Sequence, residues 1–153
     1  MTMSERIQTI KTYAQVSYDR IAEVTKDLKP EQLDWKSCKE ANTIRWILTH
    51  LVDDILVYLP NFLPSMTAPK DWPKDYVGNP GFKLEKILSD VEKSKQALMK
   101  GLDKLNVAQL NDEVDMWGSK AKREYAIMTM ISEVLHHEGQ IAAILGLEKR
   151  MKK

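Results

Sequence analysis

The sequence predicts an all-α protein folded as a single four-helix bundle over residues 1–153. Three observations predict this class. Four segments repeat apolar residues every three or four positions, no segment alternates convincingly like a strand, and 153 residues suit one domain. Four helices of about twenty residues each account for most of such a chain, which is the composition of a four-helix bundle.

The first helix is expected over residues 4–28, where apolar side chains recur at helical spacing. Ser4 is the expected N-cap, and Pro30 ends the helix because proline disfavours a helical residue before it. A short connector over 31–42 precedes the second helix, expected over about 43–62. This second helix is apolar around most of its circumference, which indicates an interior position.

A long connector rich in proline and glycine is expected between the second and third helices, over residues 64–81. Connectors of this length often form lids, site walls or interfaces, and this one permits an overhand crossing between the helices. The third helix is expected over 83–105 and the fourth over 122–145, with Gly146 as the C-cap of the fourth.

Composition narrows the possible partners and location of the chain. The formal net charge is +1, from 23 basic and 22 acidic residues, so no basic surface for nucleic acid is expected. The longest apolar stretch is interrupted by charged residues and cannot span a membrane, and residues 1–10 do not resemble a secretory signal. The one cysteine, Cys38, forms no intramolecular disulfide, and a cytoplasmic location is expected.

The residues that indicate chemistry lie in the second and fourth predicted helices. A helical residue advances by about 100°, so Glu133 and His137 project one turn apart from the same apolar stripe. A carboxylate and an imidazole on a buried face need a partner, and a divalent metal satisfies both. His50, on an apolar face of the second helix, is the expected third ligand. Three protein ligands leave a position open, as in catalytic sites.

The spacing leaves alternatives open at each of these residues. The Glu133–His137 pair could be a surface pair, and His50 could be a core histidine with satisfied nitrogens. Asp54, four residues after His50, could be an extra ligand, could orient a ligand, or could act as a base. Gln140 could hydrogen-bond a ligand or simply pack, so both residues are catalytic candidates that act through the ligands.

The chain resembles the DinB/YfiT-like family of metalloenzymes over nearly its whole length. The segments that carry the resemblance are LDWK at 33–36, NTIRWILTHL at 42–51 and HEGQI at 137–141. The resemblance implies a four-helix bundle whose metal is held by a histidine of helix two and two residues of helix four. Many members have histidine where this chain has Glu133, and the His/Glu/His set resembles the branch of mycothiol-dependent maleylpyruvate isomerase.

The resemblance implies a metal-dependent S-transferase, in which a low-molecular-weight thiol such as bacillithiol or mycothiol attacks a small electrophile. The expected metal is Zn or Ni, with Fe or Mn as alternatives, because a mixed nitrogen and oxygen site accepts all four. Three alternatives to the S-transferase hypothesis stay open. They are a hydrolase that uses the same site, a non-catalytic metal-binding bundle linked to stress, and a metal-free hydrogen-bonded network. The family resemblance also implies a homodimer.

Overall fold

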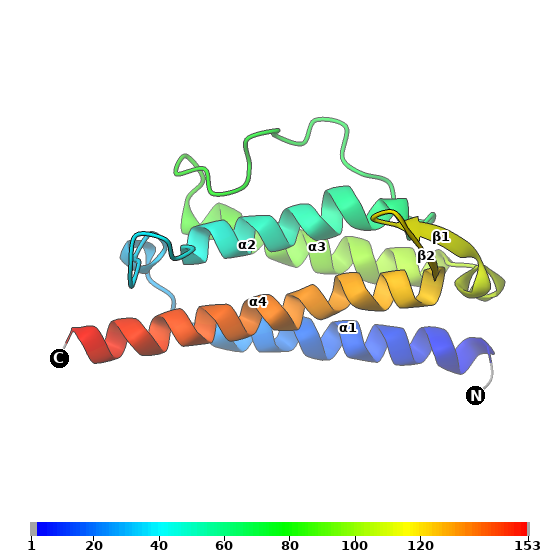
Figure 1. Cartoon of the computed structure of the whole chain (residues 1–153), viewed down its shortest axis with the longest axis horizontal. Helices are drawn as coiled ribbons and strands as arrows, with labels where there is room; N and C mark the ends of the chain where they lie inside the picture. Colours follow the sequence, from blue (N-terminus) through cyan, green and yellow to red (C-terminus); the bar gives the residue numbers. More distant parts are fainter. Residues whose placement is uncertain (1–2, 153) are drawn as a thin grey trace.

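The computed structural model describes residues 3–152 and consists mainly of helices, which confirms the predicted helical class (Figure 1). Within these residues the long helices are α1 (Met3–Thr25), α2 (Ile44–Asp53), α3 (Leu84–Lys104) and α4 (Arg123–Met151). Shorter helical turns are η1 (Pro30–Gln32), η2 (Asp54–Tyr58), η3 (Leu59–Asn61) and η4 (Val107–Asn111). No helix in this range is both long and apolar enough to cross a membrane.

The four long helices lie side by side, and each packs against two others. α1 contacts α4 and α3, and α2 contacts α3 and α4. In Figure 1, α1 and α4 run in one direction, whereas α2 and α3 run in the other. The connector between α2 and α3 therefore returns along the outside of α2 before α3 begins (Figure 1). The predicted apolar stripes form the core, with Ile10, Ala14, Leu48, Leu98 and Val134 each at most 2% exposed.

The start of α2 is fixed by a cap and by a buried cation. The Thr43 hydroxyl accepts a hydrogen bond from the Trp46 backbone at 3.0 Å, as expected for an N-cap. The buried Arg45 guanidinium forms two 2.7 Å bonds to the Asp34 carboxylate and also donates to the Phe82 carbonyl. Arg45 thus ties α2 to both connectors that flank it.

The second helix was predicted to continue regularly to residue 62, and it does not. It changes at Asp54 into a π-helical turn, in which the Leu59 backbone N–H donates to the Asp54 carbonyl five residues earlier. The physical reason is Pro60, which offers no backbone N–H to continue the regular ladder. Single π turns are rare and occur frequently at functional sites.

The prediction that the chain contains no strand was wrong. Strands β1 (Glu113–Met116) and β2 (Ser119–Lys122) form an antiparallel hairpin in which Met116 pairs with Ser119. Both turn residues have positive φ, 54° at Trp117 and 85° at Gly118, as a type I′ turn requires. Strands of four residues around a Trp-Gly turn lack the usual sequence signal, which is Asn-Gly or Asp-Gly.

Three predicted helix ends were also wrong. α1 already includes Ser4, so Ser4 is not its N-cap, and α1 ends at Thr25, three residues earlier than expected. α4 passes through Gly146 and ends at Met151. The reason is that its last turns have partners: the buried Glu148 accepts from Gln32 at 2.7 Å and pairs with Lys152 at 2.5 Å.

The long connector is anchored to the helices by polar contacts. The buried Tyr76 hydroxyl donates to Asp90 of α3 at 2.9 Å, and the Gly78 backbone donates to the Thr49 hydroxyl of α2 at 2.8 Å. The Trp72 indole donates to Asp53 at 2.8 Å. These bonds hold the connector beside the middle and end of α2, where the candidate ligands lie.

Two glycines in helices have opposite surroundings. A Cβ at Gly101 would lie 2.5 Å from Met66 and 3.0 Å from Leu63, whereas a Cβ at Gly139 would meet nothing within 4 Å. No neighbouring helix therefore approaches closely at Gly139. The close approach between segments occurs at Gly101 of α3, which packs against Leu63 and Met66 at the start of the long connector.

We predict that Gly101→Ala and Gly139→Ala shift stability in opposite directions. Crowding at Gly101 costs about 1–3 kcal/mol, which outweighs the helix propensity gained. At the exposed Gly139, alanine stabilises the helix by about 0.5–1 kcal/mol. Urea unfolding of both variants measures this difference, and a stabilised Gly101→Ala variant would contradict the packing described.

Candidate metal centre

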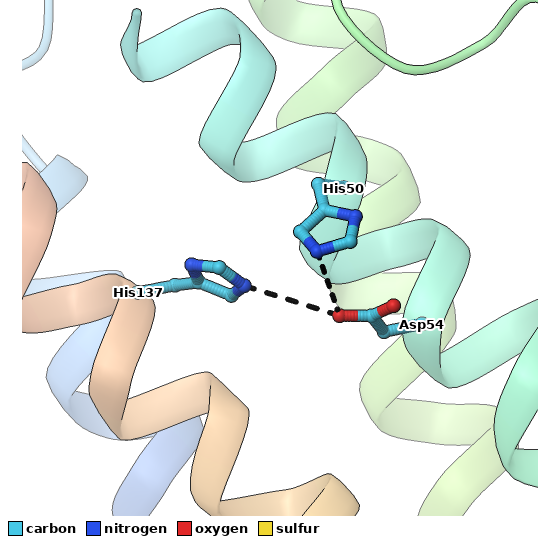
Figure 2. Close-up of side chains that lie close together, drawn as sticks. All are labelled: His50, Asp54 and His137. Carbon is cyan, nitrogen blue, oxygen red and sulfur yellow. Dashed lines mark ion pairs between the residues drawn. The ribbon is translucent and has the colours of Figure 1, made fainter. Parts of the chain in front are cut away.

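The structure brings His50, Asp54 and His137 together in the interior between α2 and α4 (Figure 2). One possible ligand atom from each residue lies within 4.8 Å of those of the other two. Asp54 Oδ2 is 3.3 Å from His50 Nε2 and 3.9 Å from His137 Nε2. The two imidazole rings meet edge to face, with centroids 5.2 Å apart. Two predicted ligands, His50 and His137, are therefore neighbours in space.

The His137 ring is buried, and only one of its nitrogens has a hydrogen-bond partner among the described residues. Its Nδ1 lies 3.0 Å from Gln140 Oε1, and because an amide oxygen only accepts, Nδ1 carries a proton. In the neutral imidazole Nε2 therefore carries the lone pair, and this atom is inaccessible to solvent and has no hydrogen-bond partner. In the protonated imidazole Nε2 faces Asp54 Oδ2 as an ion pair at 3.9 Å. A buried nitrogen without a partner costs about 1–3 kcal/mol, so its position facing Asp54 requires an explanation.

Gln140 completes a short polar chain behind His137. Its amide nitrogen lies 3.0 Å from His136 Nε2, so the amide group bridges the two neighbouring histidines. Such contacts fix the tautomer and the orientation of a ligating histidine. Of the two alternatives left open for Gln140, the structure has the contact with His137, and a contribution of Gln140 to a reaction stays a prediction.

The donor atoms suit a divalent cation. Ligands about 2.1 Å from a tetrahedral metal lie about 3.4 Å from one another, and about 3.0 Å in an octahedron. The distances of 3.3 and 3.9 Å to Asp54 Oδ2 are close to these values, so small side-chain movements are sufficient. Two imidazoles and one carboxylate are a common donor set for such ions, and the lone pair of His137 Nε2 would gain a partner. This group can hold a metal.

Glu133 does not belong to the converging group, and its role as a ligand stays a prediction. It is partly buried one turn before His137 and lines the same pocket, and its charge acts on His137. Asp54 occupies the third position near the two histidines. The signal for Asp54 was present in the sequence, because it follows His50 at the same spacing as His137 follows Glu133.

The group opens onto a pocket of about 470 Å³. The pocket is lined by His50, Asp53, Asp54, Tyr58, Val77, Trp117, Met130 and Glu133. Burial, only partly offset by the Trp72 hydrogen bond, raises the pKa of Asp53. A similar pocket of about 490 Å³ lies where the end of α1 meets the end of α4, but the described residues place no comparable group of ligands there.

The charges around His137 favour its protonated form in the absence of a metal. Burial alone would lower the pKa of His137, but the interactions with Asp54 and Gln140 and the charge of Glu133 outweigh burial and raise the pKa above its ordinary value of 6.5. The same negative surroundings that favour a proton here also favour a metal cation.

Comparison with known proteins agrees with the observed fold. The sequence model of the DinB superfamily matches residues 14–141 of this chain. A crystal structure of a conserved protein from Enterococcus faecalis superposes with a TM-score of 0.70 at 14% identity, covering 92% of this chain and 95% of that one. At this identity the likeness concerns the fold alone. No curated protein matches the sequence.

We predict a pH dependence of stability for chelator-treated protein. Because the pKa of folded His137 is raised, protonation stabilises the fold below about pH 6.5, and this contribution is lost as the pH rises through the folded pKa. Asp54→Asn lowers that pKa and shrinks the effect. NMR titration of the imidazole protons measures the pKa of His137. Asp103→Asn, which removes a carboxylate from a surface ion pair with Lys11, is the control. A His137 pKa at or below 6.5 would contradict the assignment.

Proposed function

Because this chain belongs to the DinB superfamily, we propose that it is a metal-dependent enzyme that transfers a low-molecular-weight thiol to a small electrophile. One observation carries the proposal: the buried Nε2 of His137 lacks a partner and lies beside His50 and Asp54, which line an open pocket. A site of this kind combines fixed ligands with room for an exogenous molecule.

In this proposal His50 and His137 hold the cation, and a carboxylate completes the set. The short distances to both histidines support Asp54 as that carboxylate. Glu133 borders the pocket one turn from His137 and remains the alternative that the sequence indicated. Zn or Ni is the expected metal, with Fe or Mn as alternatives.

When bound, a divalent cation supplies a Lewis acid that lowers the pKa of an adjacent thiol, so the nucleophile exists at neutral pH. The residues of the chain then have separate tasks. Gln140 holds the Nδ1 proton of His137 and so keeps Nε2 available. Asp53 and Glu133 offer carboxylates at the pocket wall that can accept the thiol proton.

The described lining of the pocket contains no thiol, aliphatic hydroxyl or amine, because none of its eight residues is Cys, Ser, Thr or Lys. In this proposal the attacking group is exogenous, either a thiol or a water molecule, and water would make the same site hydrolytic. The proposal also includes a homodimer, which the family resemblance implies, and a cytoplasmic location, which the composition indicates.

The metal assignment predicts a change in metal content. Untagged protein should contain about one divalent metal per chain, and His50→Ala and His137→Ala should each weaken binding by at least tenfold. Asp54→Ala and Glu133→Ala, compared by plasma emission analysis, identify the carboxylate ligand. Glu138→Ala is the control, because this side chain lies one residue from His137 and pairs with Arg20 instead. Full occupancy in both histidine variants would refute the site.

The transferase proposal predicts turnover with a thiol. Metal-loaded protein should join bacillithiol, mycothiol or glutathione to 1-chloro-2,4-dinitrobenzene. Chelation or His137→Ala should lower the rate by at least about 100-fold, because the thiol loses its activation, while Glu138→Ala keeps it. If none of the three thiols is turned over but ester or amide substrates are hydrolysed, the protein is a hydrolase and the transferase proposal is wrong. Absence of both activities in metal-loaded protein would indicate a binding protein.

A further inference from the structure

Trp117 occupies an unusual position at the tip of the β1–β2 hairpin. Its side chain is 71% exposed, although tryptophan is the largest apolar side chain, and its backbone adopts a φ of 54°. Residues other than glycine, asparagine and aspartate rarely adopt this left-handed conformation, and a bulky residue there costs of the order of a kcal/mol. An exposed aromatic ring held on a strained backbone needs a reason beyond folding.

The position of the ring supplies the reason, because Trp117 lines the pocket above the metal-ligand group. It comes from the hairpin, whereas His50 and Asp54 come from α2 and its π turn, and Glu133 comes from α4. The hairpin packs against the start of α4 (Figure 1). Phe62, which follows η3, meets the Trp117 ring in a T-shaped arrangement with centroids 6.3 Å apart.

The turn that presents Trp117 is held independently of the ring. The Gly118 backbone N–H donates to the Asp115 side chain at 3.0 Å, and Met116 pairs with Ser119. Glycine at position 117 would suit the turn better than tryptophan does, because glycine adopts positive φ without strain. The hairpin therefore does not need tryptophan in order to form.

The remaining wall of the pocket is strongly acidic. Asp53, Asp54 and Glu133 line it, and none of the lining residues is Lys or Arg. A divalent cation would offset two of these three negative charges and leave the pocket net negative. Negative potential in a partly enclosed site repels anionic ligands and favours neutral or cationic ones.

We propose that Trp117 is a specificity-determining residue whose ring stacks on a flat, apolar group of a neutral or cationic substrate bound at the metal centre. This inference rests on the proposed function and narrows its substrate class. It excludes small anionic acids as the preferred electrophile, and it makes anionic thiols poorer partners than uncharged ones.

The test titrates three related small molecules into the metal-loaded protein by isothermal titration calorimetry. They are imidazole, 4-phenylimidazole, and 4-phenylimidazole with a carboxylate at the para position of the phenyl ring. The phenyl ring should tighten binding relative to imidazole by about 3- to 10-fold through stacking, and the added carboxylate should cancel this gain. Trp117→Ala and Trp117→Gly should remove the phenyl gain, and Trp117→Phe should keep most of it.

Tyr125→Ala is the matched control, because Tyr125 is 63% exposed at the start of α4 but does not line the pocket. Metal content and the unfolding midpoint should be the same in Trp117→Gly as in the unmodified protein. Equal binding of imidazole and 4-phenylimidazole, an undiminished affinity for the carboxylate probe, or equal losses in the Tyr125 and Trp117 variants would each overturn the inference.

The same titrations on chelator-treated protein separate this inference from the proposed function. If the purified protein holds no metal, the proposed metal chemistry fails. At a pH at which the probes are imidazolium cations, they can bind the acidic wall without a metal, and the phenyl gain is then measured in the unmodified protein and in Trp117→Ala. Loss of the gain in Trp117→Ala under these conditions supports the substrate class, and an unchanged gain contradicts it.

Discussion

The candidate metal centre depends on one constraint, the buried Nε2 of His137, which has no hydrogen-bond partner. The imidazole is buried, its Nδ1 proton is committed to Gln140, and its Nε2 lone pair faces Asp54 and His50. Burying such an atom without a partner costs free energy that the apolar core must offset. A cation between His137, His50 and Asp54 would convert this cost into binding energy, since each of these groups offers it a lone pair.

Hydrogen bonds outside the candidate metal centre hold α2 and the long connector in position. Arg45 joins the start of α2 to both connectors, and Tyr76 and Gly78 hold the long connector against α2 and α3. The π turn begins at Asp54 itself, so the backbone leaves regular helical geometry at the residue that approaches both histidines. The hairpin then adds Trp117 at the open side of the pocket. The candidate ligands thus lie on α2, its π turn and α4, while Val77 of the long connector and Trp117 of the hairpin contribute to the pocket wall.

The sequence predicts the helices well because their apolar periodicity reports burial directly, as Ile10, Ala14 and Leu98 illustrate. It also identifies His50 and His137, since polar residues on apolar stripes are rare without a partner. It failed where local signals were outweighed by contacts distant in sequence. Gly146 is spanned by α4 because Gln32 and Lys152 support Glu148, and the short hairpin forms on a Trp-Gly turn that no common pattern marks. Asp54 follows His50, and His137 follows Glu133, at the same spacing of four residues, so periodicity alone does not choose between the two carboxylates.

X-ray absorption spectroscopy at the metal edge of the purified protein tests the proposed metal centre most directly. We expect a first shell at about 2.0–2.1 Å that contains two imidazole nitrogens and at least one carboxylate oxygen, with an exchangeable light-atom ligand in the remaining position. Addition of a thiol that reacts should introduce a sulfur ligand at about 2.3 Å. A shell without imidazole scattering, or one saturated by protein ligands that no thiol displaces, would contradict the central claim.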